Sequence, residues 1–219
     1  VRVTAIDIGS DSNLLSGDFT DSSGTQVQAY GSVVLSSSTA LDVVGGQLLT
    51  LQIPLSNRSA LTPASATLYY LDVATGRWVA DGSANLVAGA QPHYTADVTR
   101  FAQWMVGTAI TATQTVSGCV LDDAGAPAAN VRIAADGINY SSIAYTTTNA
   151  QGQFTLQLPT SSRTAVQGRR GAFLTNATAV DVQSVPISLL TCLTIPTTNA
   201  ATMRLTWGAS PSDIDSHLR

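Results

Sequence analysis

The chain contains no lysine and no glutamate, so its acidic side chains are all aspartate and its basic side chains are all arginine. Lysine and glutamate are good helix formers, whereas the threonine, valine, serine, aspartate and glycine that fill this sequence favour strands and turns. Charged residues make up only 11% of the chain, against about 25% in an ordinary domain. We therefore predict an all-β protein with an uncharged polar surface, suited to packing against neighbours or to standing outside a cell.

Other features are scarce too, and each scarcity excludes a class of function. A net charge of −4 with scattered arginines leaves no basic stripe of the kind that nucleic acid binding needs. No apolar run reaches the roughly 18 residues of a membrane span. Only His93 and His217 could transfer protons near neutral pH, and no nucleophile and base accompany them in a recognisable arrangement. We expect no enzyme, no cofactor, no nucleic acid partner and no membrane insertion for this segment.

Two groups of polar side chains could bind a metal. Asp213, Asp215 and His217 share one face of an extended chain, and Asp7, Asp11 and Asn13 could offer oxygen ligands to Ca²⁺. Neither spacing has the turn glycine and the bidentate glutamate of a calcium loop. We interpret both groups as solvated turn residues and predict no metal site.

The only two cysteines, Cys119 and Cys192, lie far apart, each in an apolar strand-like run at 116–121 and 187–195. A metal site would need closer spacing and further ligands. A structural disulfide is the favoured interpretation for an exported protein, and a pair of buried free thiols is the alternative.

Alternation of apolar and polar residues predicts strands along most of the chain. In the first half, strands are predicted at 1–8, 26–35, 47–53, 66–73, 77–80, 83–88, 94–98 and 103–107. In the second half, they are predicted at 116–121, 129–134, 143–148 and 153–158.

Turns and boundaries divide these strands into units. Gly76 and Gly152 each close a predicted hairpin turn, and residues 110–115, which have no patterned face, are interpreted as a linker or a strand lead-in. Short strands with frequent turn signals predict two consecutive β-sandwich domains. We place them at 1–109 and 110–198, with 199–219 as the beginning of a further β unit.

The stretch VSGCVLDDAGAPAANVRI at 116–133, with TTTNAQGQFTL at 146–156, resembles the carboxypeptidase regulatory-like domain. Asn149 stands where that family usually has aspartate, and both residues suit a turn. The resemblance implies a transthyretin-like β-sandwich for the second domain and implies no catalysis.

The first half is similar to a module that often precedes that domain in large bacterial surface proteins and in the cartilage intermediate layer protein group. The matching stretches are SGDFT at 16–20, ATLYYLDVATGRWVADGSA at 66–84 and YTADVTRFAQW at 94–104. Arg100 stands at a position where the family pattern usually has histidine. The family module normally begins with an upstream strand that this chain does not contain, so we expect the chain to start inside a domain.

Together these resemblances imply a secreted or cell-surface bacterial protein whose role is structural, as a stalk, matrix or fibre subunit. Its expected partners are further copies of itself or other surface proteins. Residues 201–207 alternate cleanly, and we take Thr202, Arg204, Leu205 and Trp207 as a candidate strand-exchange segment that would complete a neighbour's sheet.

The rival interpretation is a carbohydrate-binding or adhesin module with glycan partners. An exposed row of Trp78, Trp104 and Trp207 would favour glycan binding, because sugars stack on aromatic rings. Burial of these side chains would favour the structural role.

Overall fold

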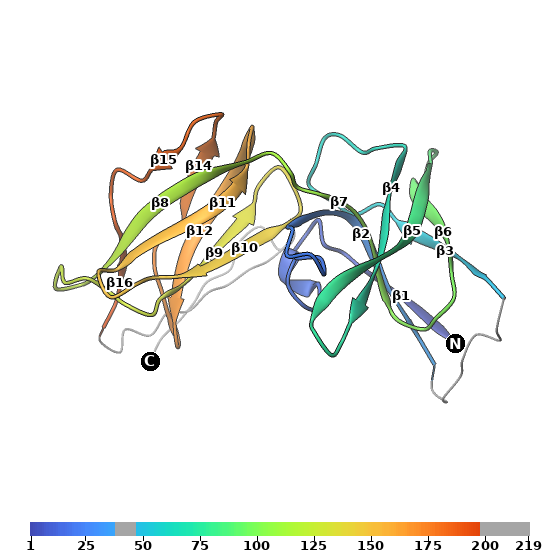
Figure 1. The fold of residues 1–219 in the computed structure, drawn as a ribbon, viewed down its shortest axis with the longest axis horizontal. Coiled ribbons are helices and arrows are strands. Elements are labelled where there is room, and N and C mark those ends of the chain that lie inside the picture. Colours follow the sequence, from blue (N-terminus) through green and yellow to red (C-terminus); the bar gives the residue numbers. More distant parts are fainter. Residues whose placement is uncertain (38–46, 198–219) are drawn as a thin grey trace, which may run out of the picture.

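The computed structural model describes residues 1–37 and 47–197. Within these residues the chain forms strands β1 to β16 and a single 3-10 turn, η1, with no α-helix, so the predicted all-β fold class is confirmed. Strands β1 to β7 form one sheet, which we call the first unit. Strands β8 to β16 form two further sheets, the second unit, which lies beside the first along the longest axis of the molecule (Figure 1).

The first unit is a seven-stranded antiparallel sheet with the strand order β1-β2-β7-β4-β5-β6-β3. Its elements are β1 (Arg2–Ile6), η1 (Ser12–Leu14), β2 (Val27–Ser36), β3 (Leu49–Pro54), β4 (Ser65–Asp72), β5 (Arg77–Val87), β6 (His93–Val98) and β7 (Gln103–Ala109). The strands predicted at 77–80 and 83–88 are one continuous strand, β5. A register irregularity in its pairing with β4 explains the break in the sequence pattern.

This sheet curls over so that β3 meets β2 and the sheet encloses its own core. The N–H of Ser56 donates to the carbonyl of Tyr30 at 2.9 Å. Gly31 is required at this contact, because a Cβ atom there would lie 2.3 Å from the carbonyl oxygen of Pro54. Trp104 and Val106 point into the enclosed core. The sandwich-like packing of this unit therefore comes from one bent sheet.

The predicted hairpin between the fourth and fifth strands is present. Gly76 adopts a left-handed conformation with φ of 68°, which glycine accepts without steric cost. The carboxylate of Asp72 accepts hydrogen bonds from the N–H of Ala74 and the hydroxyl of Thr75, so the turn residues satisfy their own polar groups.

The second unit is a sandwich of two sheets. Its elements are β8 (Thr113–Asp122), β9 (Arg132–Gly137), β10 (Ile143–Thr147), β11 (Gln153–Pro159), β12 (Ser162–Arg170), β13 (Phe173–Leu174), β14 (Thr178–Val182), β15 (Ile187–Ser188) and β16 (Leu193–Ile195). One sheet has the order β10-β9-β12-β13, with β14 also pairing with β12, and the other has β11-β8-β15, with β16 also pairing with β8. Alternate residues of both sheets, including Val116, Ile133, Leu156 and Val166, fill the core between them.

The strand predicted at 129–134 begins later than expected. Asn130 adopts a positive φ of 57°, a conformation that asparagine tolerates but a strand does not allow. The N–H of Val131 donates to the hydroxyl of Thr148 at 2.9 Å. The extended chain therefore starts only at Arg132.

The apolar run at 187–195 is also divided. Ser188 pairs with Ser117 and Leu193 pairs with Val120, so this run holds two more residues than the matching stretch of β8. The extra residues loop out, and Leu190 is fully exposed.

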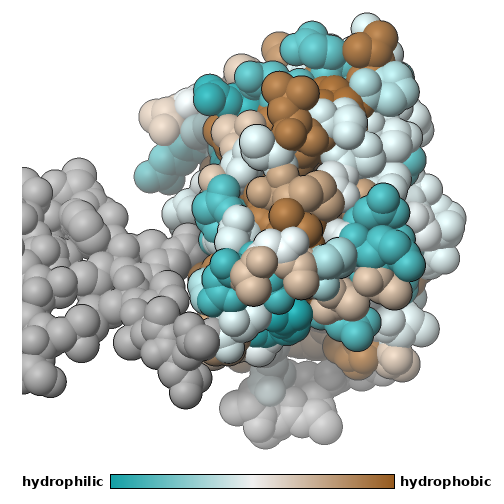
Figure 2. All heavy atoms as spheres, turned by 90° about the vertical axis from the view of Figure 1, so that its left-hand side faces the viewer, coloured by the Kyte–Doolittle hydropathy of each residue, from teal (hydrophilic) through white to brown (hydrophobic). Residues whose placement is uncertain are grey.

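The face of the second unit at the left of Figure 1 mixes hydrophilic and apolar side chains. Groups of teal side chains alternate there with pale and brown ones (Figure 2). The candidate exchange residues Thr202, Arg204, Leu205 and Trp207 lie outside the described residues, as do Asp213, Asp215 and His217.

Candidate functional site: the junction between the two units

The loop that precedes β10 lies along the free edge of β2. Strand β1 covers β2 only from Ser32 onward, which leaves the earlier part of that edge open. There the N–H of Ala29 donates to the carbonyl of Ser141 at 2.9 Å, and the amide of Gln26 donates to the hydroxyl of Ser142 at 3.0 Å. The second unit therefore bonds directly to the sheet edge of the first.

Arg58, in the loop after β3, ties three segments together. Its Nη1 donates to Oδ1 of Asp136 at 2.8 Å and to the carbonyl of Gly137 at 2.6 Å. Its Nε donates to the carbonyl of Gly9 at 3.0 Å, and its backbone N–H donates to the hydroxyl of Ser141 at 3.0 Å. One side chain thus joins the loop before η1 to the end of β9.

The ion pair between Arg58 and Asp136 is largely withdrawn from water, with side chains 19% and 32% exposed. Burial raises the pKa of the Asp136 carboxyl, because a low dielectric disfavours the charged form, and the Arg58 guanidinium offsets only part of that rise. Loss of the cation would leave a carboxylate with little hydration.

Apolar side chains from both units share one core at this junction. Ile143 of β10 is only 4% exposed and packs in a cluster with Phe19, Val27, Trp78 and Met105 of the first unit. Burial of an isoleucine side chain contributes about 1.5–3 kcal/mol, so this contact strengthens the polar ones.

The connection between the two units is short and held at both ends. Strand β7 ends at Ala109 and β8 begins at Thr113. The segment 110–115, interpreted as a linker or a strand lead-in, therefore includes the first residues of β8. The N–H of Ile110 donates to the carbonyl of Gln26 in the first unit, and the carbonyl of Ala112 accepts from the N–H of Thr160 in the second. The short connection therefore joins the two units in addition to the contacts described above.

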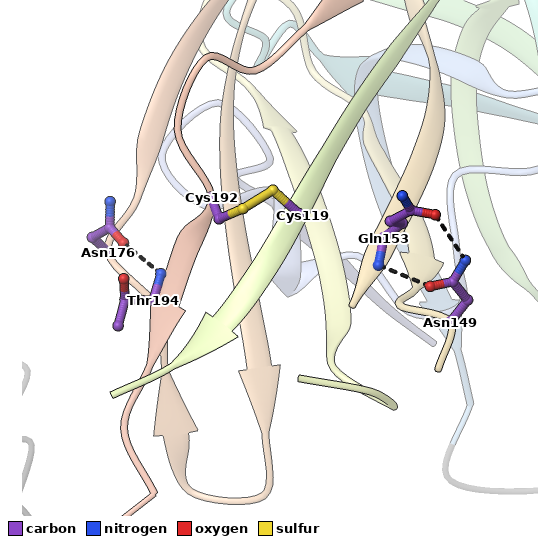
Figure 3. The surroundings of a disulfide bond; sticks show 6 residues. All are labelled: Cys119, Asn149, Gln153, Asn176, Cys192 and Thr194. Carbon is purple, nitrogen blue, oxygen red and sulfur yellow. Dashed lines mark hydrogen bonds between the residues drawn. A yellow bond between two sulfur atoms is a disulfide. The ribbon is translucent and has the colours of Figure 1, made fainter. Parts of the chain in front are cut away.

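The structure joins Cys119 and Cys192 in a disulfide, with Cα atoms 4.6 Å apart (Figure 3), which is the pairing that we favoured. Cys119 lies on β8, and Cys192 immediately precedes β16. Figure 3 also shows the backbone N–H of Thr194 bonded to the side chain of Asn176. The short strand β16 is thereby anchored on both sides.

Asn149 forms the predicted turn before β11. Its side-chain oxygen accepts a hydrogen bond from the N–H of Gln151 at 3.0 Å and another from the N–H of Gln153 at 2.9 Å, which is drawn in Figure 3. Asparagine thus serves in this turn where the resembling family usually has aspartate.

Two of the three tryptophans cannot form an aromatic binding row. Trp78 and Trp104 are both fully buried, and the indole N–H of Trp78 donates to the carbonyl of Asp18. Trp207 lies outside the described residues. Burial favours the structural role over a tryptophan-lined sugar face.

The candidate calcium residues are engaged in local turns. Oδ1 of Asp7 accepts from the hydroxyl of Ser56 and the N–H of Ser10, and Oδ1 of Asp11 accepts from the backbone and side chain of Asn13. In the part of the chain that the structure describes, no group of three or more His, Cys or Asp residues could hold a metal ion. Nor does any described helix have the length and apolarity to cross a membrane.

Arg100 has a packing role where the resembling module usually has histidine. Its guanidinium lies 4.2 Å from the ring centroid of Tyr70 and pairs with Asp81 at 3.4 Å. Nδ1 of His93, by contrast, lies 3.0 Å from the carbonyl oxygen of Gln91.

Comparison with known proteins adds little. No family model matches the chain, and no curated protein matches it. Among solved structures it is similar to the backbone protein of the group B streptococcus pilus 2b, with a TM-score of 0.32 and 9% identity over 89% of this chain and 98% of that one. A likeness this distant supports no conclusion about this chain, and the two family resemblances stay predictions.

Proposed function

We propose that this chain is a structural, non-catalytic subunit of an extracellular or cell-surface assembly such as a stalk, matrix or fibre. The observation that carries the proposal is the junction, where Arg58, Ser141 and Ile143 join two β units into one body. A rigid pair of units transmits force and fixes spacing, which is what a structural subunit must do.

Two further features support the proposed location. A disulfide persists in oxidising surroundings and is rare in the cytosol, and Cys119 and Cys192 form one here. The chain also has few charged residues, so much of its surface can be buried against neighbours without desolvating charges.

We further propose that copies polymerise by strand exchange, with β1 as the acceptor edge. All five residues of β1 are exposed or half-buried, and within the described residues β1 pairs only with β2. A hollow of about 650 Å³ adjoins the end of β1, lined by residues such as Ile6, Pro54 and Leu55. An unpaired edge is a template for an added strand, and the segment at 201–207 has the alternation to supply one.

Assembly of the purified chain tests the proposal. Light scattering and negative-stain electron microscopy should show concentration-dependent oligomers or filaments. A chain that stays monomeric at every concentration and salt tested would contradict the structural role. Deletion of 202–219 should abolish filaments and leave a folded monomer, whereas filaments from the truncated chain would rule out this mechanism of exchange.

Point variants distinguish the loss of a specific strand pairing from the mere removal of the C-terminal residues. Leu205 and Thr206 alternate in the candidate strand, so they would face opposite sides of a sheet. Leu205→Asp should prevent assembly by placing a charge on the apolar face. Thr206→Asp is the matched control and should assemble nearly as well as the unaltered chain. Equal loss in both variants would argue against a strand with this register.

A further inference from the structure

A hollow of about 660 Å³ lies on the outer face of the β10-β9-β12 sheet. Strand register puts Ala134 at its centre, with Tyr145 opposite it on β10 and Gln167 opposite it on β12. A small side chain surrounded by longer ones leaves a depression. The volume falls within the range of about 300–1,000 Å³ that is common for small-molecule sites.

Two arginines close one end of this hollow. Arg132 and Arg169 are direct cross-strand partners, and like charges in such positions repel each other. Within the described residues neither guanidinium takes part in an ion pair, as is also true of Arg2 and Arg170, whereas the other four arginines there do: Arg58, Arg77, Arg100 and Arg163. Two adjacent cations with no carboxylate partner in the described part of the chain favour an anionic ligand.

Each of the two guanidinium groups is restrained by one contact. Arg132 lies over the ring of Tyr145, 4.1 Å from its centroid, and stacking leaves the edge N–H donors of a guanidinium free. Arg169 uses its Nε to donate to the carbonyl of Gly171 at 2.9 Å. Partial restraint lowers the entropy cost of binding a carboxylate through two parallel hydrogen bonds.

The other end of the hollow carries hydrogen-bond acceptors instead of cations. Asp136 and Asn13 line it near the junction, and they offer oxygen acceptors to hydroxyl groups. A ligand that fits both ends carries one carboxylate and several hydroxyls, and it is small enough to lie over Ala134.

We propose that this hollow binds an acidic sugar, with the carboxylate of a hexuronic acid unit held by Arg132 and Arg169 and its hydroxyls directed toward Asp136. Such units occur in extracellular polysaccharides. The site would let a structural subunit attach to an anionic glycan, and binding does not depend on whether the chain polymerises.

Isothermal titration of the full chain with a hexuronic acid oligosaccharide tests the site. We expect saturable binding that weakens as salt is added, because salt screens the charges. Arg132→Gln and Arg169→Gln should each weaken binding about tenfold or more, the usual effect of losing a charge-assisted hydrogen bond. Arg163→Gln is the matched control. Arg163 lies on the same face of β12 but pairs with Asp181, so affinity should not change.

Three outcomes would overturn the proposal. The neutral oligosaccharide of the same length could bind equally well, which would show that the arginines do not select a carboxylate. Arg163→Gln could weaken binding as much as the two site variants, which would indicate nonspecific attraction. A peptide with the sequence of residues 209–219, which contains Asp213 and Asp215, could bind through the arginines while the oligosaccharide does not. The hollow would then be a protein-docking site.

Discussion

Arg58 and Asp136, which belong to different units, form an ion pair at 2.8 Å while the same guanidinium nitrogen donates to the carbonyl of Gly137. The pair lies beside the apolar contact of Ile143 with the first unit. Polar and apolar contacts at one place reinforce each other, because water excluded by the apolar side chains strengthens the hydrogen bonds. The two units should therefore unfold together rather than separately.

Arg58→Ala should lower the free energy of unfolding by about 2–3 kcal/mol, since it removes several charge-assisted hydrogen bonds and leaves Asp136 half-buried without a cation. Urea unfolding followed by circular dichroism measures this loss, and a second transition should appear as the units uncouple. Arg163→Ala is the control, because its pair with Asp181 is exposed and contributes about 1 kcal/mol or less. Equal losses in the two variants would contradict a special role for the junction.

The environment of Asp136 also predicts how the free energy of unfolding changes with pH. Burial raises the pKa of its carboxyl in the folded state, so the folded protein holds this proton more tightly than the unfolded chain does. The resulting stabilisation is complete below the unfolded pKa of about 4 and is lost as the pH rises through the folded pKa. The stability of the unaltered protein relative to Asp136→Asn should therefore increase as the pH falls from 7 to about 4.

Asp72 should change the stability of the protein with pH in the opposite direction, so it serves as the control. Hydrogen bonds from Thr75 and Ala74 lower the pKa of the Asp72 carboxyl, so its stabilisation is present at neutral pH and is lost as the pH falls. The advantage of the unaltered protein over Asp72→Asn should shrink on acidification. Urea unfolding at a series of pH values measures both changes. If the stability difference from the unaltered protein varied with pH in the same way for both variants, the environment of Asp136 would differ from the one described.

The sequence predicted strands where alternation and turn chemistry agree, but it did not predict β12 or β14. The hairpin through Gly76 and the turn at Asn149 needed only local information, because each turn satisfies its own polar groups. The disulfide between Cys119 and Cys192 was favoured because the protein is expected outside the cell and because these are its only two cysteines. In each case residues near one another in the chain, or the only residues of their kind, decided the structure.

The junction could not be predicted in this way. Arg58 lies in a loop with no repeating pattern, and its partner Asp136 lies 78 residues further along the chain. The one available signal was Asp136 itself, a charged residue that directly follows the apolar stretch from Ile133 to Ala135. Pairing between the units depends on the open edge of β2, which can be located only once β1 is known to end at Ile6, opposite Ser32. The arginine hollow likewise follows from strand register, which fixes Arg132 opposite Arg169.

Replacing both Cys119 and Cys192 with serine should lower the stability of the second unit by about 2–4 kcal/mol, because the cross-link restricts the unfolded chain. Strand β16 should lose hydrogen-exchange protection first, since it has only three residues. Intact mass should rise by about 2 Da on reduction of the unaltered protein. Alkylation of both thiols without reductant would show that the disulfide does not form.

The absence of lysine also limits how an assembly of this chain can be strengthened. Isopeptide bonds between side chains need an ε-amine, and no side chain here carries one. Strength must then come from backbone hydrogen bonds, packing and the Cys119–Cys192 disulfide. Filaments of the purified chain, boiled in denaturant with reductant, should run as a single monomer band on a gel. A ladder of covalent multimers would show that another linkage exists, and mass spectrometry of the rungs would locate it.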